Sequence, residues 1–116
     1  MKENDLLNRT FLFGVLIIRF LRTLPDTSDL KAIKYQLIKA ATSIGANYEE
    51  AQAGSSKADF TNKVNIALKE ARETNYWLRM LAELEEESVA LLPMIKESNE
   101  IKNILGTIVK NARNSQ

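Results

Sequence analysis

The chain has 116 residues, a length typical of a single domain. Its formal net charge is +1, from 16 basic and 15 acidic residues, so no overall field attracts it to nucleic acid or a membrane surface. The absence of cysteine excludes disulfides and thiolate chemistry, and the absence of histidine removes the commonest general base and metal ligand. Only two prolines and four glycines interrupt the chain, which favours long helices.

The first predicted helix covers residues 5–23 and is dominated by an apolar run over residues 11–18. A membrane-spanning helix needs about 20 apolar residues, and this run is far shorter. No small-residue cleavage site follows it, so we read it as part of a soluble, cytoplasmic protein and not as a signal peptide. One apolar stripe is led by Phe11, and a second contains Phe13, Leu16, Ile17, Phe20 and Leu24. One stripe is enough for a monomer core, so we expect the second to contact another subunit.

The second predicted helix covers residues 29–52, with Thr27 or Ser28 as its N-cap. Apolar residues recur every three or four positions and place one face in the core. Gly45 lies in its middle, where glycine costs about 1 kcal/mol relative to alanine. Small side chains let two helix backbones approach closely. We therefore expect another helix to cross at Gly45, Ala46 and Asn47.

The third predicted helix covers residues 57–84, and Ser56 with Asp59 resembles a capping box at its start. Its C-terminal half adds Trp77, Met80 and Leu84 to the apolar surface, and we expect them at the subunit interface. The fourth helix is predicted over residues 93–112, with Pro93 at its first position. Four amphipathic helices with short connections predict one all-α domain over residues 1–116, an antiparallel up-down-up-down four-helix bundle.

Polar residues suggest structural roles more than chemistry. Glu49, Glu50, Glu70 and Glu73 invite a carboxylate-bridged metal site, but bundle sites of this kind use Glu-x-x-His pairs and the chain has no histidine. We therefore interpret these four glutamates as structural or solvated carboxylates. Asn47, Asn75 and Tyr76 are expected to form a polar network with Glu50 or Glu73 that fixes helix register, with ligand binding as the alternative. We predict no catalytic, cofactor-binding or metal-binding residue.

Basic residues are spread along the chain without a basic tail. A set on three predicted helices is expected to line up into a nucleic-acid-binding patch once an oligomer repeats it, although a solvated face is the alternative for each. The set is Lys31, Lys34, Lys39, Lys63, Lys102, Lys110 and Arg113.

Three segments carry a family resemblance. They read QLIKAATSIGANYEEA (residues 36–51), SKADF (56–60) and LKEARETNYWL (68–78). Together they resemble a bacterial four-helix-bundle family whose first members are encoded in intervening sequences of large-subunit ribosomal RNA genes. The family also includes the accessory variability determinant of diversity-generating retroelements. The label of ribosomal protein that the family carries is historical and is not evidence of a place in the ribosome.

The resemblance implies a helical bundle that assembles as a ring-like homo-oligomer, a pentamer. For the retroelement members it also implies binding of a reverse transcriptase and of nucleic acid. We therefore expect a non-enzymatic oligomeric scaffold or accessory protein with no membrane association. The alternatives are a structural oligomer that binds no nucleic acid and an enzyme with an unrecognised site.

Overall fold

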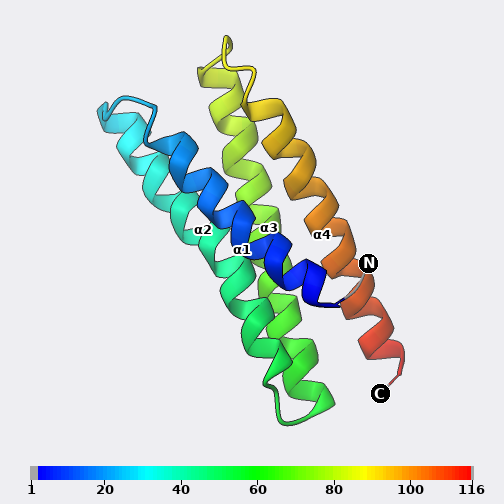
Figure 1. Ribbon diagram of the computed structural model, residues 1–116. Helices are drawn as coiled ribbons and strands as arrows, with labels where there is room; N and C mark the ends of the chain where they lie inside the picture. The colour runs from blue at the N-terminus through cyan, green and yellow to red at the C-terminus, as the bar shows by residue number, and fades with distance from the viewer. Residues whose placement is uncertain (1–2, 116) are drawn as a thin grey trace.

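The structure, a computed structural model, describes residues 3–115 and consists of four helices. They are α1 (Glu3–Leu21), α2 (Ser28–Gln52), α3 (Lys57–Leu84) and α4 (Leu91–Asn114). The described residues contain no β-strand. Figure 1 shows α2, α3 and α4 lying lengthwise, with α1 crossing obliquely in front of them. The molecule measures 46 × 21 × 19 Å. An all-α fold is therefore confirmed, and the packing is that of a helical bundle.

The helix ends follow local capping chemistry. Ser56 is the N-cap of α3, and its Oγ accepts a 3.0 Å hydrogen bond from the backbone N–H of Asp59, as the sequence predicts. Thr27 is the N-cap of α2, but its hydroxyl binds Asp29 Oδ1 at 2.6 Å instead of the helix backbone. Helix α4 begins at Leu91, two residues before the predicted start. Pro93 is tolerated there because the first four N–H groups of a helix have no internal partner.

The core joins all four helices. The face predicted for α2 is buried in full: Leu30, Ile33, Leu37, Ala41, Ile44, Tyr48 and Ala51. The core residues of α3 include Val64, Leu68, Leu78 and Leu81, and those of α4 include Met94, Ile101, Leu105 and Val109. No buried side-chain nitrogen or oxygen atom among residues 5–115 lacks a hydrogen-bond partner.

The orientation of α1 corrects the prediction. Phe13 and Ile17 are 2% and 0% exposed, so both lie in the core of this chain and not on its outer surface. Their neighbours Leu6, Thr10 and Leu21 are buried on the same side. Leu16 of the same predicted stripe is 48% exposed, and the outward side of α1 combines it with Phe11 and Leu12.

Candidate functional site

Helix α1 packs closely on the small-residue segment of α2. A Cβ atom at position 45 would lie 3.3 Å from both the carbonyl carbon and Oγ1 of Thr10. The predicted close approach at Gly45 is therefore present. Ala46 is exposed beside the crossing, and the Asn47 amide donates to the Ser43 carbonyl of its own helix at 2.8 Å. Asn47 thus satisfies its side chain locally and does not reach a second helix through that bond.

The opposite side of α1 is anchored to α4 by an ion pair. Arg9 donates to both carboxylate oxygens of Glu97. Its Nε lies 2.7 Å from Oε2, and its Nη2 lies 2.6 Å from Oε1. Glu100 lies 3.5 Å from the same guanidinium. Hydrogen bonding to Glu97, and attraction to both carboxylates, raise the pKa of Arg9. A two-bond geometry of this kind is directionally specific, so it favours the rotation of α1 that buries Phe13 and Ile17.

This rotation leaves an apolar face on the outside of α1. Phe11, Leu12 and Leu16 are 66%, 52% and 48% exposed, and Val15 between them is half-buried. Residues three or four apart on a helix are neighbours, so Val15 lies beside both Phe11 and Leu12, Leu16 lies beside Leu12, and the four side chains form one patch. We call it the α1 outer face. Large exposed patches of this type mark interaction sites.

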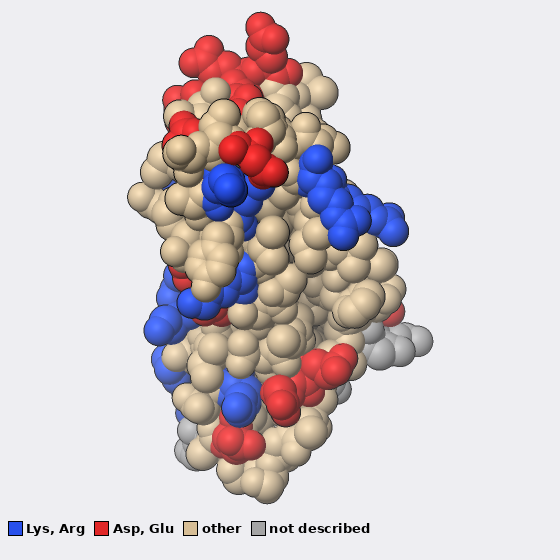
Figure 2. All heavy atoms as spheres, turned by 90° about the vertical axis from the view of Figure 1, so that its left-hand side faces the viewer, with Lys and Arg blue, Asp and Glu red and all other residues tan. Residues whose placement is uncertain are grey.

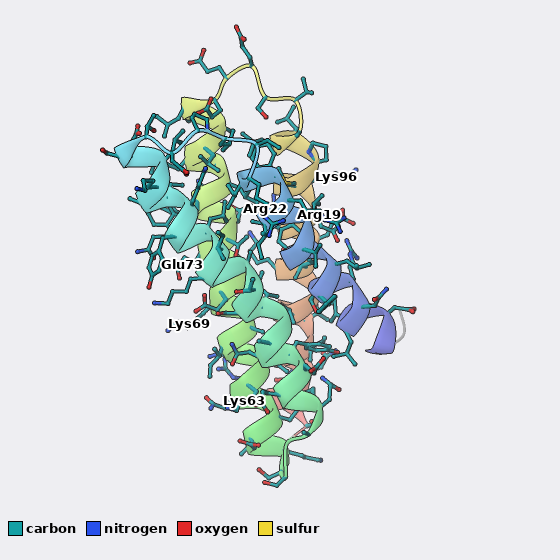
Figure 3. The ribbon with its side chains drawn as sticks, turned by 60° about the vertical axis from the view of Figure 1, so that its left-hand side comes forward. Arg19, Arg22, Lys63, Lys69, Glu73 and Lys96 are labelled. Carbon is teal, nitrogen blue, oxygen red and sulfur yellow. The ribbon has the colours of Figure 1, made fainter. Side chains whose placement is uncertain are left out.

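The α1 outer face continues into a groove between α1 and α2. Leu7, Phe11, Val15 and Ile18 form its α1 wall, and Thr42, Gly45, Ala46 and Glu49 form its α2 wall. The volume of the groove is about 400 Å³. Figure 2 shows a broad uncharged area on this side of the molecule, with both basic and acidic side chains above and below it. Arg19 and Arg22 project from the C-terminal half of α1 (Figure 3).

The other predicted interface residues divide by burial. Phe20, Leu24, Trp77 and Met80 are half-buried and pack against the core, whereas Leu84 is 51% exposed. Their place at a subunit contact stays a prediction.

A polar network lies between α3 and α4, and Asn75 is the one residue of the predicted network that takes part in it. The Asn75 amide donates to Ser98 Oγ at 3.0 Å and to Asn99 Oδ1 at 3.2 Å, while Arg79 Nε donates to Asn75 Oδ1 at 2.9 Å. Tyr76 is exposed and packs edge-on against Trp77. The network satisfies buried groups from both helices, so it fixes their relative register.

The predicted cations are dispersed. Lys31, Lys39, Lys110 and Arg113 are exposed, and Lys63 and Lys102 are half-buried. Lys34 is engaged inside the chain, since its Nζ donates to the Leu24 carbonyl at 2.6 Å and to Asp26 Oδ1 at 2.9 Å. Lys63 belongs to α3 and lies on the same side of the molecule as Lys69 and Glu73 (Figure 3). The structure therefore does not gather the whole set at one place.

Two of these lysines line the same groove as Arg72, which is not among the predicted residues. Lys102 and Lys110 of α4 line a groove with Arg72 of α3, and Leu68, Asn103, Gly106 and Thr107 complete its lining. The volume of this groove is about 490 Å³, and no acidic residue or α1 residue lines it. Recognising the group requires the register of α3 against α4, which the spacing of charges along the sequence does not supply.

The acidic residues considered for a metal do not converge. Among residues 3–115, no three Asp or Glu side chains are grouped so that they could hold a metal ion. Glu49, Glu50 and Glu73 are exposed and Glu70 is half-buried. Burial, and next the negative charge of Glu73, raise the pKa of Glu70. Among residues 3–115, none of the helices combines the length and the hydrophobicity that a membrane-spanning helix needs.

Comparison with known proteins bears on the whole chain. The family model described as 23S rRNA-intervening sequence protein matches residues 2–107. Among solved structures, the chain is similar to a protein of unknown function from the S23 ribosomal protein family of Bacteroides thetaiotaomicron VPI-5482. The two are 37% identical with a TM-score of 0.82, and the match covers 90% of this chain and 98% of that one. No curated protein matches the chain. The predicted family resemblance is confirmed; neither match concerns the retroelement members.

Proposed function

Because this chain belongs to the 23S rRNA-intervening sequence protein family, we propose that it is a non-enzymatic scaffold or accessory protein that works as a homo-oligomer. The observation that carries the proposal is the α1 outer face. Three large apolar side chains on one helix remain about half or more exposed. Full burial of an exposed Leu or Phe side chain is worth roughly 1.5–3 kcal/mol, and about half or more of that remains to be gained at each of these positions. A second copy of the chain supplies such a cover without any other component.

The finer features of the assembly belong to the same proposal. We take the bundle to have the antiparallel up-down-up-down order, and the oligomer to be a ring in the cytoplasm. The number five comes from the family resemblance, since an exposed face by itself implies only more than one subunit. The near-zero net charge of +1 opposes such assembly little.

Self-association is tested by light scattering after size exclusion. The expected mass is several times that of the 13.1 kDa chain. Replacing both Phe11 and Leu12 by Ser should lower the mass at unchanged helicity, because it removes two side chains of the α1 outer face. Val89→Ser is the matched control, since Val89 is 83% exposed but lies outside α1. A parent chain that elutes as a monomer would sink the proposal.

Nucleic acid and a reverse transcriptase are the partners that the resemblance adds to this proposal. Repetition of cations around a ring supports nucleic-acid binding, since several weak sites act together. Contacts with phosphates would make that binding fall steeply with salt, with little dependence on sequence. A gel-shift series with mixed DNA and RNA tests this part. If no complex forms even at low salt, the protein is a structural oligomer without nucleic-acid binding. The other alternative is an enzyme with an unrecognised site.

A further inference from the structure

The groove between α3 and α4 is lined by three basic residues and by no acidic one. Arg72 lines it from α3, and Lys102 and Lys110 line it from α4. On α4 the charges are separated by side: Glu97 and Glu100 face α1, where they contact Arg9, whereas the two lysines face α3. The acidic groups of α4 are thus engaged away from this groove.

The cations of the groove are not among those engaged inside the chain. Arg9 is paired with Glu97, Lys34 with Asp26, and Arg79 with the Asn75 amide oxygen. Within the described part of the chain, Arg72, Lys102 and Lys110 make no ion pair and no side-chain hydrogen bond. These three cations line one groove without an internal partner among the described residues, so an anionic ligand in the groove can pair with them.

Gly106 lies in the same groove and has no packing reason to be glycine. A Cβ atom at this position would meet nothing within 4 Å, and no glycine of the described chain has a positive φ angle. Glycine is nevertheless less favourable than alanine inside a helix. At Gly45 the crossing of α1 explains the small residue; at Gly106 the free space opens onto the groove between Lys102 and Lys110.

We propose that this groove binds the phosphate groups of an elongated ligand. The planar Arg72 guanidinium matches phosphate oxygens with paired hydrogen bonds, and the lysines add point charges. Lys102 and Lys110 are eight residues apart on one helix, about 12 Å along its axis, so a ligand that engages both carries more than one phosphate. Gly106 lets such a ligand approach the helix backbone. The phosphates come from a nucleic-acid strand or from a soluble oligophosphate.

This inference rests on the nucleic-acid part of the proposed function and does not need the oligomer. The test follows the backbone amide signals of the full-length, ¹⁵N-labelled chain during titration with tripolyphosphate and, separately, with a short oligothymidylate. Signals of Asn103, Gly106 and Thr107 should move with at least one probe. In the double variant Lys102→Gln/Lys110→Gln, the log–log salt slope of oligothymidylate binding should fall by about 1.4, which is two single-strand phosphate contacts.

The control removes the same charge elsewhere. Lys57→Gln/Lys96→Gln changes two exposed lysines outside the groove, so it should leave the slope nearly unchanged. Gly106→Leu should block binding by filling the groove, whereas Gly106→Ala verifies that the helix tolerates a side chain there. Movement with tripolyphosphate alone assigns the phosphates to a soluble ligand, and movement with oligothymidylate alone assigns them to a strand.

Three outcomes would overturn the inference. If oligothymidylate binds and neither probe moves the groove signals, or if the control pair loses as much slope, nucleic-acid binding stands and the site is wrong. If neither probe binds at low salt, the site and the nucleic-acid part of the proposed function both fail. Self-association is judged separately, by mass.

Discussion

Gly45 and Gly106 both lie inside long helices, but one position is crowded and the other is open. At Gly45 the backbone and hydroxyl of Thr10 leave little room for a side chain, whereas position 106 faces open space. The sequence predicts the first situation because Gly45 is flanked by other small residues that let a helix approach. Gly106 has no such flank, and its role depends on what α3 places opposite it.

The two glycines should therefore respond differently to substitution. Gly45→Leu is expected to lower the free energy of unfolding by roughly 1–3 kcal/mol, because the larger side chain is forced against α1. Gly106→Ala is expected to raise it by up to about 1 kcal/mol, through helix propensity alone. Urea denaturation followed by circular dichroism measures both. An unchanged midpoint for Gly45→Leu would contradict the close approach.

At the scale of elements, α2 and α1 show why periodicity succeeds and fails. Helix α2 has apolar residues mainly on one side, so its buried face follows from their spacing. In α1 the run of residues 11–18 is apolar at every position but Gly14, so two stripes fit the core equally well. The choice between them is made by Thr10 at the crossing and by Arg9, whose guanidinium reaches Glu97 on α4. These contacts join different helices, so the spacing of apolar residues along α1 does not reveal them.

Glu70 of α3, which is near Lys39 of α2, makes the free energy of unfolding depend on pH. Burial and the nearby Glu73 carboxylate raise the pKa of Glu70, while Lys69 and Lys39 oppose the shift. A raised pKa means that the folded chain holds this proton more tightly than the unfolded chain. The Glu70 contribution to stability is therefore most favourable at low pH, and it declines as pH rises from the unfolded pKa through the folded one.

Glu70→Gln should accordingly stabilise the chain at neutral pH. The gain should vanish below the ordinary glutamate pKa of about 4.3, where the carboxyl is protonated in both states. Denaturation midpoints measured from pH 3 to 8 give the comparison. Glu83→Gln, at an exposed position on the same helix, is the control for the change in net charge. A gain for Glu70→Gln that persists unchanged at pH 3 would rule out this electrostatic origin.

At the scale of the whole molecule, the sequence predicts that an apolar surface exists but not where it lies. Excess apolar residues in α1 indicate a second contact because one bundle core cannot bury them all. Placing that surface requires the rotation of α1, which reverses the predicted stripe. The α3–α4 groove is hidden from sequence for a related reason, since the register that joins Arg72 to Lys102 is set by buried Asn75 and Ser98.

Two neighbouring residues of α1 separate assembly from folding. Leu16 is 48% exposed and Ile17 is 0% exposed, although they are adjacent in the chain. A charge at position 16 enters water in the monomer and disfavours only a contact with another subunit. A charge at position 17 lies in the core, and an unpaired buried charge costs several kcal/mol. Leu16→Asp should therefore lower the mass measured by light scattering while the helical circular-dichroism signal is kept, and Ile17→Asp should abolish the cooperative folding transition. If both variants kept the parent mass and helicity, the orientation of α1 and the interface on its outer face would be wrong together.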